Sequence, residues 1–196
     1  MYSIQTTPGF IIDSRPSGEA GKLLSIFTRD LGLIMVIAQG IRFEKSKLRY
    51  HVQNHSFATF SLVRGKEFWR LTSASENGGF KESVAGREAD VLIAKIAALL
   101  KRLLQGEDPH PELFELVYSC AAFLHGTPEL SDEEFKSLES LTVLRMLHSL
   151  GYVGSDAQFV AYISSADLNR PLLQELVPIR LLANRHINQA IQESHL

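Results

Sequence analysis

The stretch Gly40–Tyr50 has the residue types that bind polyanions. It holds four basic residues and one acidic residue, with Phe43 and Tyr50 among them. Cations that are not tied into a core can reach phosphates, and exposed aromatic faces stack on unpaired bases. The alternative is a solvated loop whose charges only keep the chain soluble. The pattern predicts contacts with a DNA backbone, which we expect from Arg42, Lys45, Lys47 and Arg49, with Arg15 and Arg29 as second choices.

Other residues that carry chemistry do not form a recognisable catalytic motif. Gly18–Lys22 is too short for a phosphate-binding loop. Cys120 lies on the apolar face of a predicted helix, which favours a buried small side chain over a nucleophile. The seven histidines show no metal-ligand spacing. We therefore expect no cofactor, no metal and no enzyme; an enzyme would require Cys120 or several histidines to converge in a pocket.

The elements before residue 75 are predicted to be strands. Short apolar runs rich in β-branched and aromatic residues are separated by turn residues, and a hairpin is expected at Gly32 and another at Gly65. Five strands in so short a stretch predict a small barrel of the OB type, with the 40–54 connection as a loop or extra helix. Of Phe68 and Trp69, one should fill the barrel. The strands are expected at 9–15, 22–29, 33–39, 55–64 and 67–74.

The second half is predicted to be helical, so the fold class is α+β. Apolar residues recur at helical spacing, and Ser131 with Glu134 forms a capping box. We expect a barrel domain at 1–77 packed on a helical domain at 78–196. Helices are expected at 83–105, 110–126, 131–151 and 156–164, with a last one from Pro178.

Charge divides along the same boundary. Residues 1–75 hold ten Lys and Arg against five Asp and Glu, a net charge of +5, whereas the remainder carries −7. The front half therefore suits a polyanion, and the acidic half suits proteins. Arg64, Lys66 and Arg70 are expected to extend the positive face. One cysteine in 196 residues, with no signal or membrane-spanning run, predicts a cytoplasmic location.

Several stretches, taken in order, resemble the bacterial recombination mediator RecO family. The similarity is strongest before residue 75 and weaker from Pro111 to Tyr152. It rests on Gly9–Ile12, Ser14–Ala20, Phe27–Arg29 with Gly32, Gly40–Arg42 with Lys45 and Ser46, and Leu62–Thr72.

The resemblance implies an N-terminal OB fold on a helical domain, and a protein without catalytic activity. Members of this family bind single- and double-stranded DNA, anneal complementary strands and work with RecR and the single-strand-binding protein to load RecA. Because the helical half is acidic and suits proteins rather than DNA, we expect its apolar grooves to receive the hydrophobic tail of the single-strand-binding protein. The alternative is a protein-only adaptor that makes no DNA contact.

This sequence departs from the family in one place. Many members carry a four-cysteine zinc module shortly after the position of Gly151 and Tyr152. Here Phe159–Tyr162 stands in that region, so we expect no zinc and a small apolar contact instead.

Overall fold

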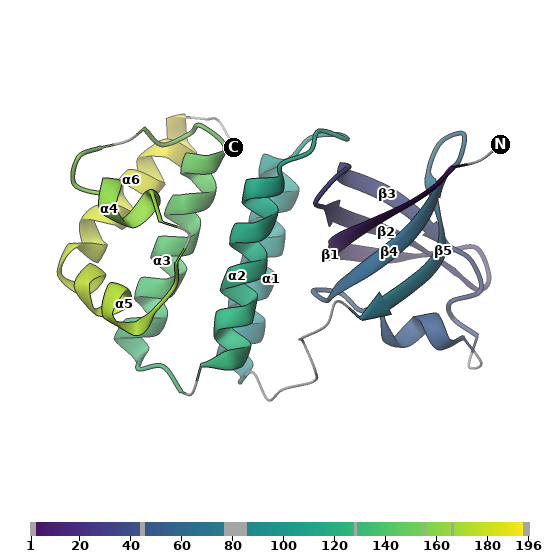
Figure 1. Ribbon diagram of the computed structural model, residues 1–196, viewed down its shortest axis with the longest axis horizontal. Coiled ribbons are helices and arrows are strands. Elements are labelled where there is room, and N and C mark those ends of the chain that lie inside the picture. The colour runs from purple at the N-terminus through teal and green to yellow at the C-terminus, as the bar shows by residue number, and fades with distance from the viewer. Residues whose placement is uncertain are drawn as a thin grey trace. The chain divides into compact units, whose positions relative to one another are not determined.

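A computed structural model describes residues 3–43, 46–76, 86–127, 129–154, 156–165 and 167–193 (Figure 1). The chain forms two compact units, Met1–Phe114 and Glu115–Leu196. The change from strands to helices falls between residues 76 and 87, beside the expected boundary at 77, but the first unit continues beyond it to Phe114. A separate domain at 1–77 therefore stays a prediction.

The described part of the first unit contains five strands that close into a barrel, as the sequence predicts. The spatial order is β1-β2-β3-β5-β4, and β1 pairs with both β2 and β4. The seam between β3 and β5 is parallel and consists of two residue pairs, Val36 with Trp69 and Ile37 with Arg70. The strands are β1 Ile4–Ser17, β2 Gly21–Thr28, β3 Gly32–Ala38, β4 Phe57–Arg64 and β5 Trp69–Glu76.

Strand β1 starts five residues earlier than expected because it runs through Pro8. Proline has no N–H for a ladder and usually interrupts a strand. Here Pro8 pairs with Thr59, and its carbonyl accepts a hydrogen bond from Arg29 N–H at 3.0 Å. The next residue, Gly9, lies where a Cβ atom would come within 2.8 Å of Ile26 and 2.9 Å of Phe60. The interior is therefore packed too closely at Gly9 for a side chain.

Alternation along the strands separates the barrel core from its outer surface. In β3 the inward residues Ile34 and Val36 are buried, whereas the outward residues Met35 and Ile37 are half-buried. Only β2 is buried on nearly every residue. The outer face of β2 is therefore covered, whereas that of β3 is covered only in part.

Aromatic residues provide part of that cover within the first unit. Phe27 of β2 meets the ring of Phe114 at 5.7 Å, and Phe57 meets Phe114 at 6.1 Å and Phe10 at 4.5 Å. Helix α1, Arg87–Leu103, contacts β1, and its Lys101 Nζ donates to Asp13 Oδ2 at 2.7 Å. This hydrogen bond lowers the pKa of Asp13. The helix is thus fixed to the barrel at a defined register.

The hairpin at Gly32 confirms the prediction and shows a second constraint. Gly32 has a φ of +72°, which favours glycine. A Cβ atom at Gly32 would also lie 2.3 Å from the carbonyl oxygen of Asp108, while Leu33 N–H donates to Gly106 O at 3.1 Å. The segment after α1 therefore lies directly on the β2–β3 hairpin.

The second unit is helical. Its capping box is confirmed, since Glu134 N–H donates to Ser131 Oγ at 3.3 Å and Ser131 N–H donates to Glu134 Oε2 at 2.9 Å. The hydrogen bond from Ser131 N–H, and after it one from the Gln174 side-chain amide at 2.9 Å, lower the pKa of the Glu134 carboxyl. The elements from the end of the first unit onward are α2 Pro111–Gly126, α3 Asp132–Ser149, α4 Val160–Ile163, α5 Arg170–Leu176, the short 3-10 helix η2 Val177–Ile179 and α6 Arg180–Glu193.

A buried arginine holds the segment around α4. Arg145 Nε donates to Tyr162 O at 2.7 Å, and its two terminal nitrogens donate to Asp167 O at 3.1 and 3.2 Å. Phe159 is fully buried and its ring lies 5.1 Å from that of His186. Phe159 is thus the buried residue of this region, and the ring contact it makes is with the His186 imidazole. None of the helices in the described residues is both long and apolar enough to cross a bilayer.

Candidate nucleic-acid interface

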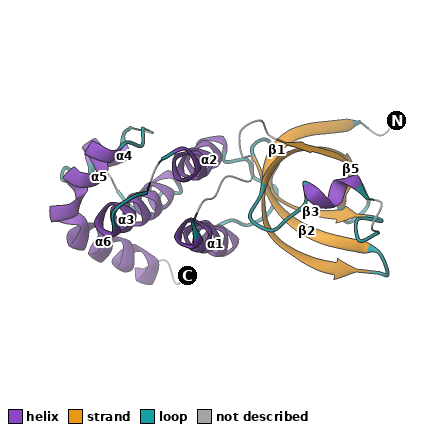
Figure 2. Cartoon of the chain, turned by 90° about the horizontal axis from the view of Figure 1, so that it is seen from below, coloured by secondary structure: helices purple, strands orange, loops and turns teal. Residues whose placement is uncertain are grey.

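The connection between β3 and β4 is anchored in the barrel by its apolar residues. Ile41 and Val52 are each 2% exposed and belong to the barrel core, and Leu48 packs against the same core. Between them lies the short 3-10 helix η1, Lys47–Tyr50, which Figure 2 shows beside the strands. Of the basic side chains between them that the structure describes, Arg42 and Arg49 are exposed.

Arg42 and Phe43 are both exposed in the first part of this connection. Phe43 is 63% exposed, which is unusual for a large apolar side chain. Arg42 N–H donates to Ala20 O at 3.0 Å, and Phe43 N–H donates to Gly40 O at 3.2 Å, with Gly40 at a φ of +66°. The backbone is thus held beside the β1–β2 turn while the guanidinium and the aromatic ring stay accessible.

The other predicted contact residues are distributed unevenly. Arg15 is exposed near the end of β1, next to the β1–β2 turn. Arg49 is exposed in η1, and Arg29 is exposed at the opposite end of β2; both take part in interactions within the protein. For Lys47 only the backbone is described, as the first residue of η1, and Lys45 lies outside the described residues. The structure therefore gathers Arg15, Arg42 and Arg49 at one end of the barrel and leaves Arg29 at the other.

One predicted member of the positive face is already paired. Glu107, from the segment after α1, binds the guanidinium of Arg64 and accepts a hydrogen bond from Trp69 Nε1 at 3.2 Å. The Arg64 guanidinium carbon lies 5.0 Å from the centre of the Trp69 ring. Trp69 itself is 5% exposed and fills the barrel, which settles the choice between Phe68 and Trp69. Sequence spacing gives no signal for a pair 43 residues apart.

The described residues contain neither an accessible cysteine nucleophile nor a cluster of metal-ligating side chains. Cys120 is fully buried, and burial raises the pKa of its thiol to about 11, although Thr142 Oγ1 donates to its sulfur at 3.3 Å. No group of three or more metal-ligating side chains occurs in the part of the chain that the structure describes. Among the described residues of the first unit, the exposed groups suited to a polyanion are cations and the ring of Phe43.

A closed five-stranded barrel with this topology, followed by helices, is an OB-fold domain with a helical region. Residues 1–78 match the family described as "Recombination protein O N terminal". The barrel domain of this chain is therefore an N-terminal domain of the RecO family.

Curated relatives extend the similarity beyond the barrel. Proteins named "DNA repair protein RecO" are 29% identical over 143 residues in Desulfitobacterium hafniense, 30% over 144 residues in Rubrobacter xylanophilus and 30% over 154 residues in Burkholderia pseudomallei. These alignments cover 72%, 74% and 77% of this chain and 50%, 56% and 52% of the respective relatives. The chain thus spans about half the length of the curated relatives it matches.

Proposed function

We propose that this chain is a DNA repair and recombination protein that acts by binding DNA rather than by catalysing a reaction. It binds single- and double-stranded DNA, brings complementary strands together for annealing, and with RecR helps to load RecA onto strands coated by the single-strand-binding protein. Family membership and the relatives' names support the repair role. The proposal locates the protein in the cytoplasm with the nucleoid.

The observation that carries this proposal is the exposed pair Arg42 and Phe43 on a connection anchored by buried Ile41 and Val52. A cation next to an exposed ring supplies both a phosphate contact and a stacking surface. When cations neutralise phosphates on two strands, repulsion between the strands falls and counterions are released, so complementary bases can pair. Such contacts carry no sequence preference.

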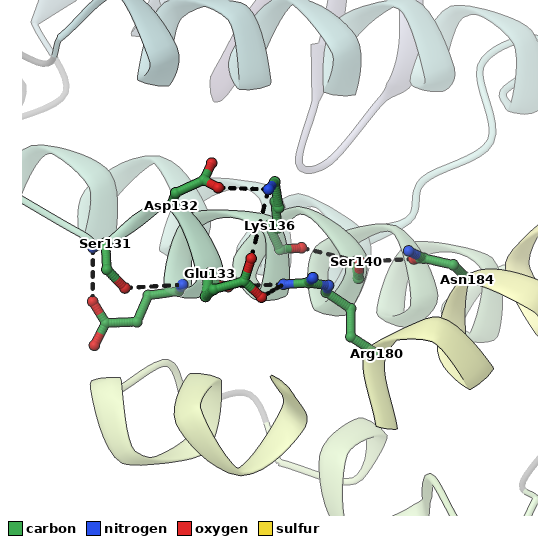
Figure 3. Close-up of polar contacts among 8 residues, drawn as sticks. Ser131, Asp132, Glu133, Lys136, Ser140, Arg180 and Asn184 are labelled. Atoms are coloured by element: carbon green, nitrogen blue, oxygen red, sulfur yellow. Dashed lines mark hydrogen bonds and ion pairs between the residues drawn. The ribbon is translucent and has the colours of Figure 1, made fainter. Parts of the chain in front are cut away.

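The second unit has a surface that is suited to binding a protein partner. A pocket of about 440 Å³ between α3 and α6 is lined by apolar Val143 and Ile187, and Leu181 at its edge is 70% exposed. The cations beside it are already neutralised: Lys136 pairs with Asp132, and Arg180 pairs with Glu133 (Figure 3). An apolar groove of this kind suits the hydrophobic tail of the single-strand-binding protein.

The test is charge reversal in the connection. Changing Lys45, Lys47 and Arg49 together to Glu should weaken binding of a labelled single strand and reduce the slope of log affinity against log salt by about 0.7 for each lost phosphate contact. The measurement is a filter-binding titration at several salt concentrations.

The matched control is Arg185→Glu, which changes an exposed cation on α6 and should leave affinity and slope unchanged. Unaltered binding in the triple variant would remove the connection from the interface. Absence of DNA binding by the unaltered chain would favour the protein-only adaptor. Annealing of complementary oligonucleotides, with and without the single-strand-binding protein, then tests the mediator role.

A further inference from the structure

The segment between α1 and α2, residues 104–110, brings a carboxylate to the β4–β5 hairpin within the first unit. The Arg64 guanidinium contacts both oxygens of the Glu107 carboxylate, and Trp69 Nε1 donates to Glu107 Oε1 at 3.2 Å. One cation of the hairpin is therefore bound to an anion that comes from elsewhere in the same chain.

The backbone on either side of Glu107 is held without the help of its side chain. Leu33 N–H donates to Gly106 O at 3.1 Å, and Gly106 has a φ of +75°. On the other side, the backbone of Asp108 lies so close to Gly32 that a Cβ atom there would not fit. The carboxylate of Glu107 can therefore move away while the segment stays on the β2–β3 hairpin.

The ion pair between Arg64 and Glu107 lies at the surface. Their side chains are 52% and 43% exposed, so water and salt weaken the attraction and a competing anion has access to both. The Arg64 guanidinium carbon also lies 5.0 Å from the centre of the Trp69 ring. This second contact keeps the guanidinium in position when the carboxylate leaves.

Two further cations lie close to this ion pair. Lys66 and Arg70 are exposed and line, together with Arg64, a concave surface of about 530 Å³, and none of the described residues that line it is Asp or Glu. A phosphate group presents several charged oxygens, and a guanidinium binds phosphate and carboxylate with the same fork of N–H donors. A phosphate drawn to this surface therefore competes with Glu107 for Arg64.

We propose that Glu107 is an internal competitor of nucleic-acid phosphate: its carboxylate occupies Arg64 in the free chain, and a phosphate group replaces it there when a strand binds. Phosphates linked in one strand replace it more readily than free phosphate, because neighbouring contacts raise their effective concentration at Arg64. The inference rests on the proposed function and concerns the regulation of its binding surface.

The first experiment removes the charge of the competitor in the full chain. Glu107→Gln keeps the shape and one acceptor oxygen, and it should raise the affinity for an oligothymidine about two- to fivefold, because binding no longer breaks a surface ion pair. The measurement is a filter-binding titration. The control is Glu88→Gln, which makes the same change of charge at an exposed residue in the first turn of α1 and should leave the affinity unchanged.

A double-variant cycle tests whether Glu107 acts through Arg64. In an Arg64→Gln background there is no guanidinium to release, so adding Glu107→Gln should leave the affinity for oligothymidine as it is. A gain of the same size in that background would show that Glu107 acts only through overall charge, and would overturn the proposal.

A second readout needs no substitution. Trp69 is the single tryptophan of the chain and its indole N–H donates to Glu107, so one side-chain resonance in a ¹H–¹⁵N spectrum reports on this contact. Oligothymidine should shift that resonance in the unaltered chain, and inorganic phosphate at an equal phosphate concentration should shift it less. This titration decides the question even where a variant fails to fold.

The outcomes separate this inference from the proposed function. Oligothymidine binding that depends on the β3–β4 connection, with an unshifted Trp69 resonance and an unchanged affinity in Glu107→Gln, would overturn the role of Glu107 and keep the proposed function. Equal shifts with oligothymidine and inorganic phosphate would overturn the advantage of linked phosphates. If the unaltered chain bound no DNA, both proposals would fall together.

Discussion

Cys120 shows how the surroundings of a residue decide its chemistry. A thiolate is the reactive form of cysteine, and a thiol that is fully buried is kept protonated because its charged form would lose hydration. The apolar spacing along α2 was sufficient to predict this burial. It was not sufficient to predict the hydrogen bond from Thr142, because that contact joins residues on different helices.

We predict that Cys120 in the folded protein resists alkylation by iodoacetamide at pH 8 and reacts after unfolding in urea. Because its pKa is raised from 9.0 to about 11 in the folded state, the unfolded chain releases a proton first as pH rises from 9. The free energy of unfolding should therefore decrease between pH 9 and 11. Mass spectrometry measures the labelling, and rapid labelling of the folded chain would contradict the burial.

The cluster of Arg64, Trp69 and Glu107 could not be predicted from the sequence either, because it too joins residues that are distant along the chain. Arg64 and Trp69 are recognisable as hairpin residues, but their acceptor arrives from a segment after α1 that only the tertiary fold brings near. The prediction that Arg64 adds to the free positive face was wrong because a carboxylate from distant sequence neutralises it. Lys66 and Arg70 were correctly expected on the surface.

At the scale of elements, strands, turns and helix caps can be predicted from the sequence because residues close together in the chain determine them. The five strands, the hairpin at Gly32 and the cap at Ser131 all follow from alternation, turn residues and capping side chains. Helix α5 was not predicted because it has only seven residues and too few turns to show a period. Its signals were Asn169, whose side chain accepts from Leu172 N–H at 2.9 Å, and a proline in the first turn.

Gly9 gives a prediction about how strand β1 crosses the barrel. The substitution Gly9→Ala should lower the free energy of unfolding by about 1–3 kcal/mol, because the new methyl group overlaps Ile26 and Phe60 in a packed core. The urea midpoint should fall with an unchanged m-value. The control is Gly126→Ala at the end of α2, where a Cβ atom meets nothing within 4 Å. A stable Gly9→Ala variant would show that the core can rearrange there.

At the scale of the whole molecule, the chain separates its charges. The first 75 residues carry +5 and the rest carry −7, so a net charge of −2 hides a cationic barrel. The sequence alone predicts this division, because it depends only on counting residues. It does not predict which cations are already paired within the protein, as Lys101 is with Asp13 and Arg64 is with Glu107.

The short seam between β3 and β5 determines where local opening of the barrel should begin. Two residue pairs close it, whereas seven pairs join β1 to β4 and seven join β2 to β3. Backbone amides that face this seam should take up deuterium from heavy water before those of β1 and β2, because local opening begins where fewest hydrogen bonds break. Slower uptake at the seam than elsewhere would contradict this. Such opening would move the β4–β5 hairpin, which bears Lys66 and Arg70, away from β3. A DNA strand bound to both β3 and this hairpin would therefore slow the deuterium uptake.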